Sequence, residues 1–114
     1  MEDATFFVFI LLSPIRPFVM NRNMPEIRQV LAFVAIVETG SFTLAAKRLN
    51  LTQSAISHSL RSLEDALNTR LIDRKGKFHT LTPTGEVFLR HCHAVLAELD
   101  RAVRHMSELQ QQAV

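Results

Sequence analysis

Apolar side chains recur every three or four positions along the first patterned part of the chain, and this spacing predicts helices. The first helix is predicted from Pro25, which suits a first helical position, to Thr39, with Gly40 ending it. A second helix of two turns follows, and Ser41 caps it through its hydroxyl. The apolar positions are Ile27, Val30, Leu31, Val34 and Val37 in the first helix and Phe42, Leu44, Ala45, Ala46 and Leu49 in the second.

A third helix is predicted over Gln53–Leu67, between a cap at Thr52 and an end at residues 68–69. At about 100° per residue its two faces differ in chemistry. The apolar face holds Ile56, Leu60, Leu63 and Leu67, and the polar face holds Gln53, Ser54, Ser57, His58 and Arg61. Only a tight turn at residues 50–51 separates the second and third helices. Three helices within about 42 residues, the last two joined by such a turn, have helix-turn-helix spacing.

Two short runs, Arg70 to Asp73 and Phe78 to Leu81, predict a small hairpin. Its basic tip consists of Arg74, Lys75, Gly76 and Lys77. Thr82 and Pro83 then form a cap followed by a first-turn proline, which opens a helix that can run to about Gln112.

This last helix carries an apolar seam whose members alternate spacings of four and three. They are Phe88, Cys92, Val95, Leu99, Ala102, Met106, Leu109 and Ala113, and Leu89, Leu96 and Val103 widen the seam. Because such a seam would be exposed in a monomer, we predict pairing with a second copy of the chain. The alternative is that the helix folds back over its own core.

Residues 1–23 lack this pattern. The apolar run from Phe6 to Leu12 fits a short strand or a membrane-seeking stub, but it is shorter than the roughly 20 residues that span a bilayer. Glu2 and Asp3 stand where a secretory signal would have basic residues. A second explanation is that Met24 is the natural start and that the preceding residues are an upstream extension.

Composition limits the function classes. A chain of 114 residues has room for one ordinary domain, and 47% apolar residues with few Gly and Pro fit a helical globular protein. One cysteine cannot form an internal disulfide, so we predict a reducing, cytoplasmic setting. The net charge of +2 decides little, although residues 24–81 hold eight Lys and Arg against five Asp and Glu.

The polar face of the third helix predicts DNA reading. It begins with Gln and Ser instead of the Glu and Lys of an ordinary solvated face. Gln pairs with N6 and N7 of adenine, Arg pairs with O6 and N7 of guanine, and Ser lets a helix lie deep in the major groove. The basic hairpin favours this interpretation, because it can contact phosphate and the minor groove. The alternative for both surfaces is ordinary solvation.

The stretch VLAFVAIVETGSFTLAAKRLNLTQSAISHSLRSLEDALNTRLIDRKGKFHTLTPTGEVFL resembles the winged helix-turn-helix domain of LysR-type transcriptional regulators over residues 24–89. By this resemblance, TQSAISHSLRSLE is the recognition helix, RLIDRKGKFHTLTPTGE contains the wing, and the following helix is a dimerising linker. The DNA-binding residues that it implies are Gln53, Ser54, Ser57, His58, Arg61 and, in the wing, Arg74.

The resemblance has two departures. The family more often has Pro at Ser54 and Arg at His58. His is only partly charged near neutral pH, whereas Arg is a fixed planar cation, so the identity of the DNA half-site is the property in doubt. We add Lys75 as a phosphate contact, and Ser41 and Thr52 because they stand at helix starts, whose N–H groups bind phosphate.

Other chemistries are not supported. His91, Cys92 and His93 are neighbours that point about 100° apart on a helix, so they cannot converge on one metal ion. Ser57, His58 and Asp65 have no oxyanion element beside them, so we predict no enzymatic activity. A dimeric protein-interaction module with a winged fold is the rival function, but a protein interface would favour aromatic residues on the polar face.

The sequence therefore predicts a mainly α winged helix-turn-helix protein with three helices, a two-stranded wing and a long dimerising helix. Residues 1–23 are expected to be an extension, 24–82 the DNA-binding domain, and 83–114 the linker helix. The expected partners are double-stranded DNA and a second copy, as a homodimer or higher oligomer, with no cofactor, metal or membrane. Family members normally continue into an effector-binding domain, so we expect a fragment or short form without a small-molecule effector site.

Overall fold

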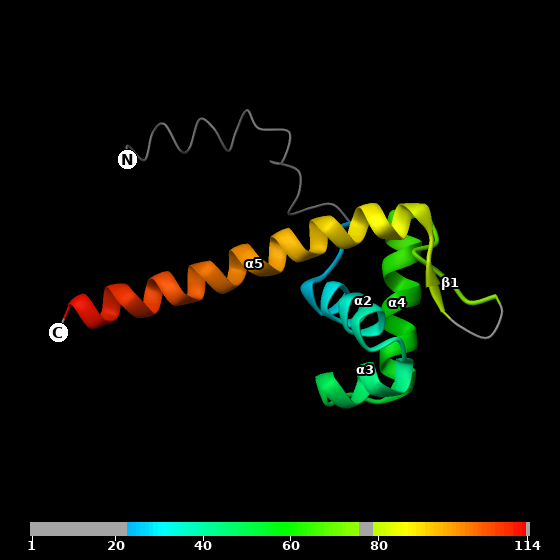
Figure 1. Ribbon diagram of the computed structural model, residues 1–114, viewed down its shortest axis with the longest axis horizontal. Coiled ribbons are helices and arrows are strands. Elements are labelled where there is room, and N and C mark those ends of the chain that lie inside the picture. The colour runs from blue at the N-terminus through cyan, green and yellow to red at the C-terminus, as the bar shows by residue number, and fades with distance from the viewer. Residues whose placement is uncertain (1–22, 76–78, 114) are drawn as a thin grey trace.

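The computed structural model describes residues 23–75 and 79–113, which contain four helices and one two-stranded hairpin (Figure 1). The helices are α2 (Ile27–Thr39), α3 (Phe42–Leu49), α4 (Gln53–Leu67) and α5 (Pro83–Gln112), and the strands are β1 (Ile72–Asp73) and β2 (Thr80–Leu81). The run from Phe6 to Leu12, the tip residues Gly76 and Lys77, and Phe78 of the predicted second strand lie outside the described residues. The predicted order of three helices, wing and long helix is confirmed.

The start of α2 differs from the prediction. The helix begins at Ile27, two residues after Pro25, because Glu26 is the N-cap. The backbone N–H of Glu26 donates to Oε1 of Gln29 at 3.0 Å, which closes a capping box. Pro25 therefore precedes the cap instead of occupying the first turn.

The other helix ends follow from the residues predicted there. Gly40, Asn50 and Asn68 end α2, α3 and α4 with positive φ angles of 70°, 58° and 54°. Left-handed backbone of this kind is open to glycine and tolerated by asparagine, and it stops a helix. The side chains of Ser41, Thr52 and Thr82 cap α3, α4 and α5 by accepting a hydrogen bond from the N–H three residues on, at 3.1, 3.1 and 2.9 Å.

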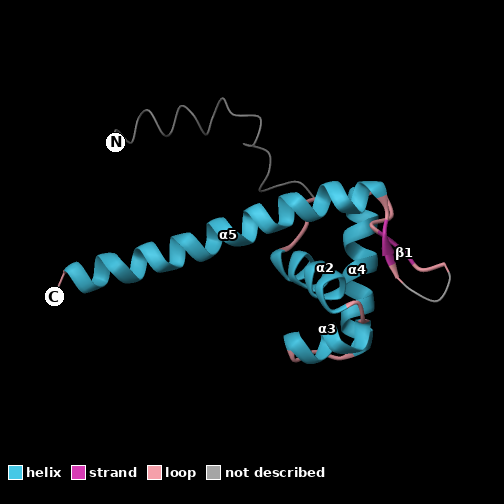
Figure 2. Cartoon of the chain, viewed as in Figure 1, coloured by secondary structure: helices cyan, strands magenta, loops and turns pink. Residues whose placement is uncertain are grey.

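The apolar faces of α2, α3 and α4 meet in one core, and the first turns of α5 close it (Figure 1). The largest fully buried side chains are Phe33, Ile36, Ile56, Leu60, Leu63, Leu71 and Cys92. The rest of α5 projects away from the other helices, as Figure 2 shows. Ile27 and Leu31, which belong to the predicted apolar stripe of α2, remain 42% and 38% exposed. The stripe therefore extends beyond what the described chain covers.

The wing strands are shorter than predicted and pair antiparallel in two positions, Ile72 with Leu81 and Asp73 with Thr80. One further backbone bond continues the pairing before β1, because the N–H of Thr82 donates to the carbonyl of Leu71 at 3.0 Å. The other bonds of this segment involve side chains. The carbonyl of Arg70 accepts from the hydroxyl of Thr82 at 2.6 Å, and the N–H of Leu71 donates to the carboxylate of Glu64.

The start of α5 lies very close to the segment before β1. A Cβ atom on Gly85 would stand 2.1 Å from the carbonyl oxygen of Leu71, so only glycine fits this position. Among the described residues, no helix combines the length and apolar character needed to cross a membrane.

Candidate nucleic-acid interface

The polar face of α4 is an open surface. Gln53, Ser54, His58 and Arg61 are exposed and Ser57 is half-buried, and together they line a hollow of about 370 Å³. On the opposite side Ile56, Leu60 and Leu63 are fully buried. The structure thus brings together all five side chains that the helical arithmetic assigned to one face. The short side chains of Ser54 and Ser57 allow this face to approach base edges closely.

A side-chain contact from α3 orients the first residue of this face. The hydroxyl of Thr43 donates to Oε1 of Gln53 at 3.2 Å. Oε1 keeps a second lone pair and the amide nitrogen keeps two donors, which is the set that adenine recognition needs. Sequence reasoning missed Thr43, because a contact across ten residues depends on how α3 and α4 cross.

Ser41 and Thr52 stand at the starts of α3 and α4, where they were predicted. Their hydroxyls serve as caps, accepting from Leu44 and Ala55. The N–H groups of the first helical residues have no partner within their own helix and are suited to an anion. Any contact between these positions and phosphate would therefore run mainly through the backbone.

The described base of the wing, residues 72–75 and 79–81, carries Arg74 and Lys75 on its surface. The N–H of Lys75 donates to Oδ1 of Asp73 at 2.9 Å, which fixes the start of the tip. The guanidinium carbon of Arg74 lies 5.0 Å from the centre of the Phe42 ring, and the ring of His79 lies 5.0 Å from the same centre. Neither of these two contacts of the Phe42 ring was predicted from the sequence.

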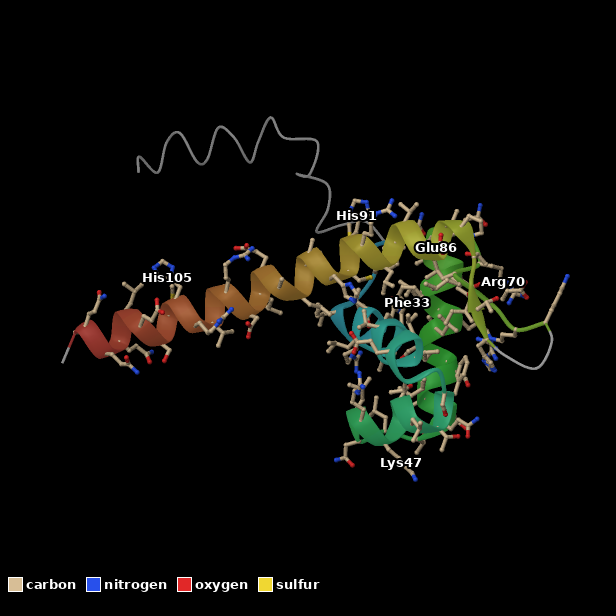
Figure 3. All side chains as sticks on the ribbon, in the orientation of Figure 1. Phe33, Lys47, Arg70, Glu86, His91 and His105 are labelled. Carbon is tan, nitrogen blue, oxygen red and sulfur yellow. The ribbon has the colours of Figure 1, made fainter. Side chains whose placement is uncertain are left out.

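The cations divide into paired and unpaired groups. Arg28 pairs with Glu26 at 3.3 Å, and Arg48 pairs with Glu38 at 2.6 Å. Among the described residues, no carboxylate lies within 4.0 Å of the cationic groups of Lys47, Arg61, Arg70, Arg74, Lys75 and Arg90. Figure 3 shows Lys47 on α3 and Arg70 beside the wing. Four of these six unpaired cations come from α4 and the wing region, which favours attraction of a polyanion there.

The predicted seam of α5 divides into two parts. Phe88 and Cys92 belong to the chain's own core, where the ring of Phe88 lies 5.8 Å from that of Phe33. The later members Val95, Leu99, Ala102, Met106 and Leu109 are exposed along the projecting part of the helix. The surface open to a second copy thus begins after the first two predicted positions.

The histidines around Cys92 do not point toward one another. His93 faces Glu38, with Nε2 at 3.7 Å from Oε2, and His91 points away from the domain (Figure 3). Cys92 is 2% exposed, and its burial raises the pKa of the thiol to about 11. No group of three potential metal ligands occurs within the part of the chain that the structure describes.

Residues 27–86 match the family model described as bacterial regulatory helix-turn-helix protein, lysR family. The chain is 36% identical over 78 residues to the HTH-type transcriptional regulator AlsR of Bacillus subtilis (strain 168), covering 68% of this chain and 26% of AlsR. It is 44% identical over 72 residues to the HTH-type transcriptional regulator PerR of Escherichia coli (strain K12), covering 63% of this chain and 24% of PerR. The chain thus spans about a quarter of either relative.

The fold is similar to a crystal structure of the BenM DNA-binding domain in complex with catB site 1 DNA. The TM-score is 0.71 at 32% identity, covering 74% of this chain and 94% of that chain. The family match extends from the first residue of α2 into the start of α5 and so includes the helix-turn-helix, the wing and the Gly85 contact. This chain therefore belongs to the lysR family of bacterial regulatory helix-turn-helix proteins.

Proposed function

We propose that this chain binds double-stranded DNA sequence-specifically as a transcriptional regulator, with α4 in the major groove and the wing beside it. The observation that carries the proposal is the five-residue polar face of α4, which is open to solvent and whose Arg61 lines a second hollow together with Arg70 and Arg74. The face has no Phe, Tyr or Trp, which favours DNA over a protein partner. We propose a role in the cytoplasm and no catalytic activity.

The residues on this face have different tasks in the proposal. Gln53 reads a base through its amide, and Ser54 and Ser57 allow close approach. His58 and Arg61 follow along the same face and contact a base edge or phosphate. Arg74 and Lys75 supply contacts from the wing, and Ser41 and Thr52 present the starts of α3 and α4 to phosphate.

We further propose that residues 24–82 form the DNA-binding unit and that residues 83–114 form a dimerising helix. The exposed apolar positions of α5 from Val95 to Leu109 are the proposed contact between two copies. Two copies would present two α4 helices to two half-sites, so the operator should have approximate twofold symmetry.

The test separates base reading from phosphate positioning. A preferred duplex is first selected from random-sequence DNA with the full chain. Gln53→Ala should then weaken binding to that duplex by about 1 to 3 kcal/mol and flatten the preference at one base position. The matched control is Lys75→Ala, which should weaken binding to selected and random duplexes alike and lower the salt dependence. An equal loss on both duplexes for Gln53→Ala would refute its reading role.

A further inference from the structure

One aromatic ring connects the wing to the helix-turn-helix. Phe42 is the first residue of α3, is 8% exposed and belongs to the core, so its ring is a fixed platform. Arg74 lies over this ring, and His79 contacts it with an angle of 59° between the ring planes. One of these residues precedes and the other follows residues 76–78. Both described arms of the wing base therefore contact the same side chain.

This connection matters because the wing pairing is short. Only two residue pairs join β1 to β2, and a hairpin of that size is a weak constraint by itself. Bonds from Thr82 and Glu64 hold the segment before β1, and the contacts with Phe42 add a further constraint, which comes from α3. The next residue of α3, Thr43, bonds to Gln53 at the start of α4. A short path of contacts thus runs from Arg74 through α3 to the reading face.

The contact with Phe42 leaves the hydrogen-bonding capacity of Arg74 intact. The attraction between a cation and an aromatic ring uses none of the acceptors that an N–H donor needs, and no hydrogen bond of the Arg74 side chain occurs among the described residues. No carboxylate among the described residues lies within 4.0 Å of this guanidinium. The ring therefore orders a long side chain without occupying the donors that a phosphate or a base edge would accept.

We propose that Phe42 is a positioning residue for DNA binding, which holds Arg74 at a fixed place relative to α4 before DNA arrives. This inference rests on the proposed function. Ordering a flexible side chain in advance lowers the entropy that binding loses, so the benefit appears as tighter binding. From the strength of exposed cation–π contacts we expect a contribution of about threefold in affinity.

The experiment removes the ring in the full chain. Phe42→Leu takes away the ring beside Arg74 and should weaken binding to the selected duplex about threefold. Arg74→Ala should then cost less affinity in the Phe42→Leu background than in the unsubstituted chain.

A second measurement needs no DNA. In nuclear magnetic resonance spectra of the free protein, the side-chain protons of Arg74 should be shifted upfield by the Phe42 ring, and Phe42→Leu should abolish this shift. Should that variant fail to fold, fluorinated phenylalanines at position 42 keep the shape of the ring while they weaken its negative face. Affinity should then fall stepwise with the number of fluorines, which a purely structural role would not produce.

The outcomes separate the two claims. If the unsubstituted chain binds no duplex selectively, the proposed function fails and this role of Phe42 fails with it. If the chain binds a duplex selectively, any one of three results overturns only the role of Phe42. These results are an absent Arg74 shift, independent addition of the effects of Arg74→Ala and Phe42→Leu, and tighter binding by Phe42→Leu. Tighter binding would mean that the ring withholds Arg74 from DNA.

Discussion

The carboxylate of Glu64 holds the segment between α4 and the wing. Its Oε2 atom accepts the backbone N–H of Leu71 at 2.8 Å and that of Ile72 at 3.3 Å. Glu64 is itself 6% exposed, and the two residues that it binds are 0% and 3% exposed. A charged side chain is therefore buried in order to satisfy two backbone donors that water cannot reach. Replacing it should destabilise the fold although no apolar contact is removed.

The size of the effect follows from these two bonds. Glu64→Met keeps the length of the side chain but leaves both donors without an acceptor, and an unsatisfied buried donor costs roughly 1 to 3 kcal/mol. Because the bond to Ile72 is longer, we expect a total loss of about 2 to 4 kcal/mol in the free energy of unfolding. Glu64→Gln keeps an acceptor oxygen and loses only the charge, so it should cost about 1 kcal/mol.

Urea unfolding followed by circular dichroism measures these differences. Asp65→Asn is the matched control, because Asp65 is the exposed neighbour of Glu64 and should change stability by less than about 0.5 kcal/mol. Amide hydrogen exchange at Leu71 should also accelerate in Glu64→Met. If Glu64→Met is as stable as the unsubstituted chain, the assignment of this carboxylate as the acceptor that the wing segment requires is wrong.

Three further predictions concern α5. Gly85→Ala should lower the thermal midpoint although alanine favours helices, because its methyl group would meet the Leu71 carbonyl; an unchanged or raised midpoint would contradict this packing. The raised pKa of Cys92 keeps the thiol protonated, so at pH 8 alkylation in the native protein should be about a hundredfold slower than in denaturant, and equal rates would refute its burial. Leu99→Glu should yield monomers in sedimentation, whereas Ala97→Glu, on the opposite face of the helix, should not; a monomeric unsubstituted chain would exclude the proposed pairing.

Local signals predicted most of the fold. The bounds of α4 agree with the prediction from Thr52 to Asn68, because a cap and a left-handed asparagine act on their own neighbours. The same holds for the end of α2 at Gly40 and for the start of α5 at Pro83. The start of α2 was predicted wrongly because two local signals compete there, and the capping box prevails over the proline.

The candidate site was predictable only in part, because sequence patterns report on neighbours within one element and not on contacts between elements. Helical periodicity places the five polar side chains of α4 on one face, because all belong to one element. The contacts that orient them and the wing come from other elements. Thr43 reaches Gln53 across a turn, and Arg74 reaches Phe42 from 32 positions further along the chain. No pattern within a single helix or strand contains such information.

The seam of α5 shows why an apolar pattern identifies a buried surface without identifying what buries it. Phe88 and Val95 lie one heptad apart, so periodicity gives them the same status. Their surroundings differ because they lie on different turns of α5. The first turns pack on the core beside α2, whereas the later turns extend past it. Phe88 is covered by Phe33 of its own chain, while Val95 remains 51% exposed. One continuous apolar pattern can therefore belong to two different contacts. The chain's own core covers its first part, and the proposed second copy would cover the rest. Because both contacts would lie on the same helix, the position of a partner copy relative to the DNA-binding unit would depend on how the first turns of α5 pack on α2.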